Sequence, residues 1–182
     1  MDIMAAIRDR RSIRRFTDGG VSPEQVRQLL DAVRWAPSWG NSQCWEVIAV
    51  RNADVKQRLR ELLSPKNPAG PAMTQAPVVF VMAAQMKKSG WYKGQIVTKF
   101  NEWFMFDLGL ATQNLCLAAH GLGLGSVIAG AFDHERAREI LAMPEEYEVV
   151  TMIPVGYPDQ APSAPKRREG DDFAHFDRFG GK

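Results

Sequence analysis

A chain of 182 residues is long enough for one domain with a substantial core and hardly long enough for two. Hydrophobic residues at 45% and charged residues at 24% are ordinary globular values, which excludes a disordered chain. The formal net charge of +2 gives little support to a nucleic-acid partner, which favours a broad basic face. The longest apolar run, Ala76 to Ala84, is about half of a membrane span, and no secretory signal is visible. We therefore expect a soluble, cytoplasmic protein that binds neither nucleic acid nor membrane.

Periodicity and capping signals predict the secondary structure in chain order. Ser22, Pro23 and Gln25 form the clearest start signal, a capping box with proline in the first helical turn. Pro77 to Ala84 is continuously apolar and predicts a strand buried on both faces. The predicted helices are 2–9, 22 to about 36, 54–63, 103–122 and 133 to about 142, and the predicted strands are 45–50, 77–84, 126–131 and 149–155.

Three segments fit none of these elements. Residues 64–75 contain three prolines and are expected to form a loop. Residues 86–100 are mixed, with Gly90 opening an irregular excursion that could act as a lid. The tail 159–182 carries spaced aromatic and basic residues but no element that could build a core, so it should lie on a partner subunit. Helices and strands alternate without a regular βαβ rhythm, which predicts one α+β domain, 1–182, with a mixed sheet.

The most charged stretch lies close to the N-terminus, where five arginines fall within eight positions. Ile13 and Phe16 give this stretch something to bury. If it is extended, Arg10, Ser12 and Arg14 share one side. Two guanidinium groups and a hydroxyl suit a phosphate. For this stretch alone, a solvated or salt-bridged arginine face is an equally good interpretation.

No residue pattern predicts side-chain catalysis. The glycines between Gly121 and Gly125 close a helix and open a strand, which is the reverse of a dinucleotide-binding fingerprint. The three histidines form no ligand cluster with Cys44 or Cys116, so no metal site is predicted. Without a nucleophile, an acid–base pair or a metal, any chemistry would have to come from a cofactor.

Six ordered blocks make the chain resemble the nitroreductase family. They run through nearly the whole chain, so together they are much more specific than any single motif. The blocks are Arg10-Arg-Ser-Ile-Arg14-x-Phe16, Ala36-Pro-Ser-Trp-Gly-Asn-Ser-Gln-Cys-Trp45, Asp107-Leu-Gly-Leu-Ala-Thr-Gln-Asn-Leu115 with Ala118 to Gly123, Ile128-Ala-Gly-Ala-Phe132, Ile153-Pro-Val-Gly-Tyr-Pro158 and Lys166-x-Arg168.

The resemblance implies a mixed, mostly antiparallel sheet flanked by helices, in an intertwined homodimer with FMN at the subunit interface. It also implies an FMN-dependent NAD(P)H oxidoreductase. Hydride would pass through flavin N5, in a ping-pong cycle, to a nitroaromatic, quinone or similar acceptor. Arg14 would face the flavin pyrimidine, with Gly130 near N5 and no side-chain acid or base. The residues implied to bind the cofactor are Arg10, Arg11, Ser12, Arg14, Ile128, Ala129, Gly130, Lys166 and Arg168, joined from the second subunit by Pro37, Ser38, Trp39 and Asn41.

The chain departs from the family pattern in three places. Cys44 replaces a proline and is expected to be a buried thiol. The flavin-contacting Asn and Lys that some members carry cannot be matched to 64–75, and residues 86–103 have no clear counterpart. The aromatic candidates for the acceptor pocket, which at helical spacing are more often core residues, are Trp91, Tyr92, Phe100, Trp103 and Phe104.

Other functions stay open on the sequence alone. One is a specialised family relative, such as an enone reductase, a reductive dehalogenase or a flavin-fragmenting enzyme. Another is a flavin-binding protein without turnover. A third is an anion-binding protein whose arginines hold nucleic acid or an acidic partner, which would show a steep salt dependence and no chromophore.

Overall fold

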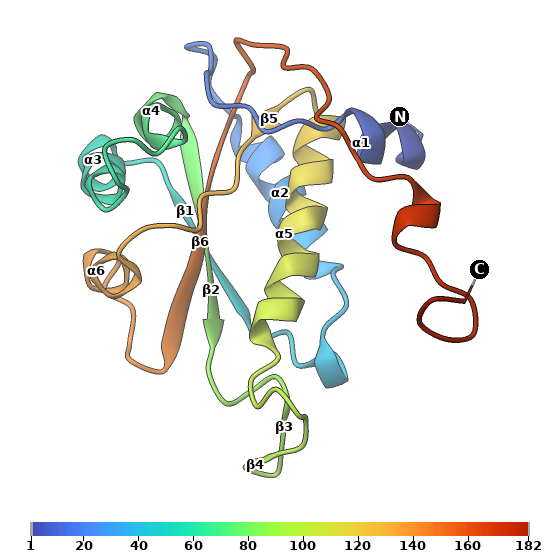
Figure 1. The fold of residues 1–182 in the computed structure, drawn as a ribbon. Helices are drawn as coiled ribbons and strands as arrows, with labels where there is room; N and C mark the ends of the chain where they lie inside the picture. The colour runs from blue at the N-terminus through green and yellow to red at the C-terminus, as the bar shows by residue number, and fades with distance from the viewer. Residues whose placement is uncertain (1, 182) are drawn as a thin grey trace.

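A four-stranded antiparallel sheet separates two layers of helices (Figure 1). The computed structural model describes residues 2–181. The sheet has the order β1-β2-β6-β5, built from β1 (Trp45–Val50), β2 (Val78–Gln85), β6 (Tyr147–Gly156) and β5 (Gly125–Ser126). Helices α2 (Pro23–Arg34) and α5 (Phe104–Gly121) cover one face, and α3 (Ala53–Glu61), α4 (Gly70–Gln75) and α6 (His134–Ile140) cover the other. The remaining short elements are α1 (Ile3–Asp9), η1 (Trp39–Asn41), β3 (Trp91–Tyr92), β4 (Gln95–Ile96) and η2 (Gly170–Asp172).

Strand β2 explains why both layers can pack on one sheet. Its side chains alternate, so Phe80 and Met82 pack with α2 and α5, whereas Val79 and Val81 pack on the α3, α4 and α6 side. All four of these side chains are fully buried. The predicted strand with two buried faces is thus confirmed, as is the α+β class. Parallel pairing among the described residues is confined to an isolated bridge between Ser12 and Ser126.

Helix α2 starts at the predicted capping box. The Ser22 hydroxyl accepts a hydrogen bond from the Gln25 backbone N–H at 3.1 Å, and the Gln25 side-chain oxygen accepts one from the Ser22 N–H at 2.9 Å. Leu29 and Val33 are buried against the core, which fixes the face that α2 turns toward α5. The capping box and the apolar stripe therefore both indicate the helix that the structure shows at α2.

The prediction that residues 64–75 contain no regular structure is wrong. Helix α4 occupies Gly70–Gln75, with Pro71 in its first turn, where a missing N–H costs nothing. Ala72 and Met73 are fully buried, so tertiary packing rather than helix propensity stabilises this short helix.

The predicted strand 126–131 is much shorter in the structure. Strand β5 ends at Ser126, and pairing with β6 resumes only at the bridge between Ala129 and Met152. Val127 turns into the core while Ile128 points outward and is half exposed, so the ladder is interrupted over these two residues. The interruption leaves the backbone after β5 free to contact something other than the sheet.

Helix α5 is the longest element and is apolar nearly all round, as predicted. One side packs on α2 and the sheet, yet Met105 and Phe106 near its N-terminus are more than half exposed. Within residues 2–181 no helix has the length and hydrophobicity needed to cross a membrane.

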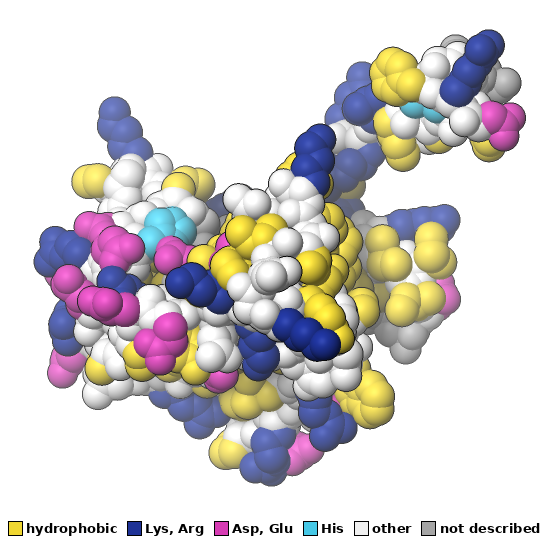
Figure 2. All heavy atoms as spheres, turned by 90° about the horizontal axis from the view of Figure 1, so that it is seen from below, with side chains coloured by type: hydrophobic (Ala, Val, Ile, Leu, Met, Phe, Trp, Pro, Cys, Tyr) yellow, Lys and Arg dark blue, Asp and Glu magenta, His cyan; other side chains and the backbone are white. Residues whose placement is uncertain are grey.

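The C-terminal tail leaves the body of the molecule as an arm (Figure 2). Its start is fixed by a hydrogen bond from the Asp159 N–H to the Arg15 carbonyl, after which nearly every residue is exposed. Phe173, Phe176 and Phe179 are all more than half exposed on this arm. The expectation of a tail without its own core fits this shape, whereas its contact with a partner subunit stays a prediction.

Candidate functional site

The arginine segment is held against the edge of the sheet. The Ile13 N–H donates to the Ser126 carbonyl at 2.9 Å, and Phe16 forms an antiparallel bridge with Pro158. Ile13 and Phe16 are buried, as expected from their apolar side chains. These anchors fix the positions of Arg10 and Arg14 on either side of the Ser12 bridge.

A cavity of about 260 Å³ lies over this segment. Arg10 Nε and Arg14 Nε are buried beside it and have no acceptor among residues 2–181. None of the ion pairs formed within residues 2–181 involves either arginine, so the salt-bridged alternative finds no support. The cavity is lined by Arg10, Arg11, Ser12, Arg14, Pro162, Ser163, Pro165 and Arg167.

Arg11 differs from its neighbours because its guanidinium is already engaged. One of its terminal nitrogens, Nη1, donates to the Arg8 carbonyl at 2.5 Å and to the Arg10 carbonyl at 2.9 Å. Arg11 therefore braces the backbone, whereas Arg10 and Arg14 retain donors that a ligand could use.

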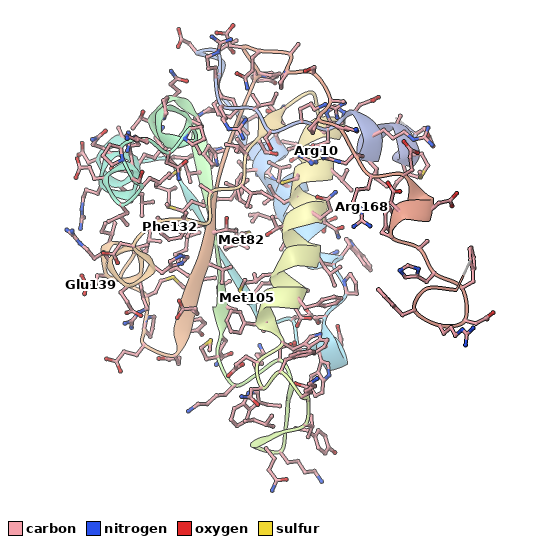
Figure 3. The ribbon with its side chains drawn as sticks, in the orientation of Figure 1. Arg10, Met82, Met105, Phe132, Glu139 and Arg168 are labelled. Atoms are coloured by element: carbon pink, nitrogen blue, oxygen red, sulfur yellow. The ribbon has the colours of Figure 1, made fainter. Side chains whose placement is uncertain are left out.

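The basic cluster of the tail is only partly brought to this cavity. Arg167 lines it, but Arg168 donates to the Asp172 carbonyl and lies over the Phe173 ring at 5.5 Å. Figure 3 shows Arg168 on the tail, on a different part of the chain from Arg10. Lys166 is exposed and is not among the lining residues. In this arrangement Arg167 is the basic residue of the tail that lines the cavity, and phosphate binding by Lys166 and Arg168 stays a prediction.

The segment 128–130 lies next to the arginine segment because Ser126, which precedes it, pairs with both Ser12 and β6. Ala129 exchanges two backbone hydrogen bonds with Met152, each of 2.9 Å, and is buried. Gly130 is exposed, and its N–H donates to no described residue. This segment therefore combines a backbone fixed at Ala129 with N–H donors at Ile128 and Gly130 that no described residue accepts.

A second, larger cavity of about 740 Å³ joins this segment to α5. Its wall is mainly apolar, with His134 fixed by a 2.8 Å contact between Nδ1 and the Val149 carbonyl. Of the predicted acceptor-side aromatics, only Phe104 contributes to it within the described chain. The lining residues are Met86, Phe104, Met105, Leu108, Gly109, Thr112, Gln113, Ile128, Gly130, His134 and residues 148–151.

The remaining aromatic candidates lie around the N-terminal end of α5. Trp91 and Tyr92 form β3 of a small hairpin with β4, and Tyr92 and Phe100 are mostly exposed. Trp103 precedes α5 and stacks at a tilt on Phe100, with ring centroids 5.7 Å apart. The hairpin projects beyond the N-terminal end of α5 (Figure 1).

The loop predicted to bind the partner's cofactor lies at this same end. The Trp39 N–H donates to the Asp107 carboxylate in the first turn of α5, at 2.9 Å. The arginine segment instead lies near the C-terminal end of α5, where His120 and Arg10 line one cavity. His120 follows Asp107 by thirteen positions of the helix, or about 20 Å. Residues 37–41 are thus far from the arginines of their own chain.

Two further residues of interest were missed by the sequence reasoning. The Asn67 side-chain amide lies 3.5 Å from the Ala131 carbonyl, beside the 128–130 segment, within a stretch that was expected to be a simple loop. Asp107 is fully buried and collects hydrogen bonds from residues distant in sequence. No local signal predicts either placement, because both depend on tertiary packing.

Comparisons with known proteins agree with this architecture. The family profile described as "Nitroreductase family" matches residues 7–75 and 64–157. The chain is 32% identical over 166 residues, 89% of its length and 80% of the relative's, to a protein of Methanothermobacter thermautotrophicus with the provisional name NADH dehydrogenase/NAD(P)H nitroreductase. A protein of Archaeoglobus fulgidus with the same name is 31% identical over 98% of this chain and 93% of its own.

The fold is also that of a solved structure, the NADPH:FMN oxidoreductase of Vibrio harveyi complexed with NAD+. The TM-score is 0.83 at 25% identity, over 97% of this chain and 77% of the other. The chain thus combines an α+β fold with an arginine-lined cavity at the sheet edge. The chain belongs to the nitroreductase family.

Proposed function

We propose that the chain is an FMN-dependent NAD(P)H oxidoreductase that reduces nitroaromatics, quinones or similar electron-poor acceptors. The cofactor is FMN and the electron donor is NAD(P)H. The family and the named relatives support this class of enzyme.

The observation that carries the proposal is the pair of buried Nε donors of Arg10 and Arg14. A buried donor without an acceptor costs about 1–3 kcal/mol, so two of them bordering one cavity are costly unless a ligand satisfies them. Arginine binds phosphate with parallel, charge-assisted hydrogen bonds, and Ser12 adds a hydroxyl at the same cavity. The residues present therefore fit the phosphate group of FMN.

Each part of the site would have a distinct task. Arg10, Ser12 and Arg167 would hold the phosphate, and Arg14 would offset negative charge on the pyrimidine side of the ring. The Gly130 N–H would offer a donor to the ring edge, where a small residue permits close approach. Bound FMN supplies the hydride-carrying chemistry that these side chains lack. The protein contributes positioning and electrostatics, with no single essential acid or base.

We propose a homodimer in which the second subunit completes the site. Residues 37–41 and the arginine segment lie near opposite ends of α5, about 20 Å apart along the helix, which supports contact of the two with one FMN from different subunits. The exposed apolar side chains Met105 and Phe106 on α5, and the coreless arm, give such an interface surface to bury.

Mixed dimers test this arrangement. Arg14→Ala damages the arginine side of the site and Asn41→Ala damages the loop side. A hybrid of the two variants should contain one intact site and one doubly damaged site. About half of the wild-type FMN content should return in the hybrid, above that of either parent homodimer. Hybrids with no more FMN than the parents would refute a shared site.

Steady-state and single-turnover kinetics test the reaction. Parallel double-reciprocal lines for NAD(P)H and a nitroaromatic or quinone are expected if donor and acceptor use the same site in turn. Efficient turnover of one enone or haloaromatic alone, among a panel of acceptors, would point instead to a specialised relative. A yellow protein that oxidises neither NADH nor NADPH would contradict the enzyme assignment.

A further inference from the structure

Asp107 is a buried carboxylate that no cationic side chain of the described residues neutralises. It is fully inaccessible and takes part in no ion pair formed within residues 2–181. Its charge is balanced by donors and by its place in the first turn of α5, where the helix dipole favours an anion. A buried ionised group is tolerated only when it is well hydrogen-bonded, so the donors around it identify what it holds in place.

Those donors come from two segments that are far apart in sequence. From the 38–44 loop, the Trp39 N–H donates to Oδ1 at 2.9 Å and the Ser42 hydroxyl to Oδ2 at 3.2 Å. From the excursion 86–103, the fully buried Ser89 hydroxyl donates to Oδ2 at 2.6 Å. The Cys44 thiol lies 3.6 Å from the same oxygen. One carboxylate therefore joins both segments to α5.

The 38–44 loop needs an external restraint because its backbone is strained. Gly40, Asn41 and Gln43 all have positive φ angles, of 53°, 52° and 45°. Left-handed conformations are uncommon outside glycine, and such residues persist only when their surroundings fix them. Asp107 contacts the loop on both sides of Gly40, through Trp39 and Ser42.

The excursion 86–103 is likewise closed at its base. The Trp103 N–H donates to the Ser89 carbonyl at 3.1 Å, and the Val97 N–H donates to the Gly90 carbonyl at 3.0 Å. A Cβ at Gly90 would lie 2.5 Å from the Asn101 carbonyl oxygen, so the two chain segments at the base of the excursion are in close contact. The β3–β4 hairpin is mostly exposed, whereas the base of the excursion is fixed by the hydrogen bond from Ser89 to the Asp107 carboxylate.

We infer that Asp107 is a positioning residue that sets the cofactor-side loop 38–44 and the acceptor-side excursion 86–103 in one arrangement. The naming of loop 38–44 as the cofactor side and of excursion 86–103 as the acceptor side rests on the proposed function. The hydrogen bonds of both segments to Asp107 do not depend on that function. Weakening the anchor should loosen both segments together. FMN affinity and acceptor KM should then change in the same variant, although Asp107 touches neither ligand.

Hydrogen–deuterium exchange on Asp107→Asn tests the anchor directly. The amide keeps the shape but loses the charge and replaces one acceptor oxygen with a donor group facing Ser42 and Ser89. Exchange in residues 38–44 and 86–103 should become about tenfold faster, the factor that corresponds to one weakened charge-assisted hydrogen bond. Exchange in β2 should change only with global stability.

Asn114→Ala is the matched control. Asn114 lies on the same helix two turns later and donates to the Ala32 carbonyl of α2 at 3.0 Å. Loss of this hydrogen bond should destabilise the fold by a similar amount without affecting loop 38–44 or excursion 86–103. If Asn114→Ala accelerates exchange in both segments as much as Asp107→Asn does, Asp107 has only a general structural role and the inference is overturned.

The serine variants keep the carboxylate and remain informative if Asp107→Asn does not fold. Ser89→Ala removes only the excursion's donor, yet it should also speed exchange in the 38–44 loop and raise the acceptor KM more than it changes kcat. Local exchange confined to the excursion would overturn the coupling. Exchange in both segments can be measured without any cofactor, so a protein that binds no FMN would refute the proposed function and leave the anchor to be judged separately.

Discussion

Gly125 controls how closely the arginine segment can approach the sheet. A Cβ at this position would lie 2.7 Å from Ile13 Cβ and Cγ1 and 2.8 Å from Cγ2. Ordinary contact begins at 3.4 Å, so Gly125→Ala must displace Ile13 by about 0.7 Å. The Ile13 N–H···O bond to Ser126, now 2.9 Å, would stretch to about 3.6 Å, which is no longer a hydrogen bond.

The cost follows from these two effects. Overpacking a buried contact costs about 1–3 kcal/mol. Losing the hydrogen bond adds about 1 kcal/mol. Together they predict a fall of about 5–15 °C in Tm for a chain of this length. Because Ser12 and Arg14 flank Ile13, the Kd for FMN should also rise at least tenfold, as expected if contacts with FMN worth about 1.4 kcal/mol are lost.

Thermal unfolding and flavin-fluorescence titration measure both quantities. Gly121→Ala is the control, because a Cβ at the end of α5 would meet nothing within 4 Å. It should leave FMN affinity unchanged and stabilise slightly. A Gly125→Ala protein with wild-type Tm and FMN affinity would refute the close packing of Ile13 on Gly125 as the device that positions the arginines.

Three further variants or probes test separate parts of the account. Arg14→Ala should raise the FMN Kd about ten- to a hundredfold, since a charge-assisted hydrogen bond contributes about 1.5–3 kcal/mol, whereas exposed Arg15→Ala should have no effect. Lys56→Met should lower the unfolding free energy by about 1–2 kcal/mol, because Nζ donates to two carbonyls at the end of α4. Burial, followed by the Asp107 charge, raises the pKa of the Cys44 thiol to about 11, so alkylation at pH 8 should be about a hundredfold slower than for an ordinary thiol.

The pH dependence of Lys56 has a definite sign. Burial lowers the pKa of its ammonium group, so between that lowered value and the ordinary one near 10.4 the unfolded chain binds more protons than the folded one. Stability should therefore rise with pH through this interval in the wild type, relative to Lys56→Met. Equal pH slopes for the two proteins would contradict this prediction for Lys56. Rapid alkylation of Cys44 in the folded state would contradict the prediction for its thiol. An FMN Kd unaffected by Arg14→Ala would contradict the prediction for Arg14.

The parts of the fold that sequence predicts well are those with local causes. The capping box at Ser22 and Gln25 and the apolar run of β2 each carry their own signal, and both are confirmed. Helix α4 was missed because its prolines suggest a loop, while the burial of Met73 that stabilises it depends on distant elements. The predicted strand 126–131 is longer than β5 because an apolar run does not show where pairing with the neighbouring strand ends.

In the candidate site, too, sequence predicts the residues that a local pattern places and misses those placed by tertiary packing. Arg10, Ser12 and Arg14 share a cavity, as the extended segment predicts, although Arg11 from the other side of the alternation lines it as well. Arg167 rather than Lys166 or Arg168 lines that cavity, since the tail is irregular and its alternation cannot be extrapolated. The role of Asp107 depends on partners more than sixty residues earlier in the chain, which no local pattern reveals.

The most direct test of the account is the visible absorption spectrum of the purified protein, with the released chromophore identified after denaturation. The account predicts FMN at about one per subunit and bleaching of its absorbance on anaerobic addition of NADH or NADPH. A colourless protein that also fails to bind added FMN would contradict it, and the buried donors of Arg10 and Arg14 would then require a different anion.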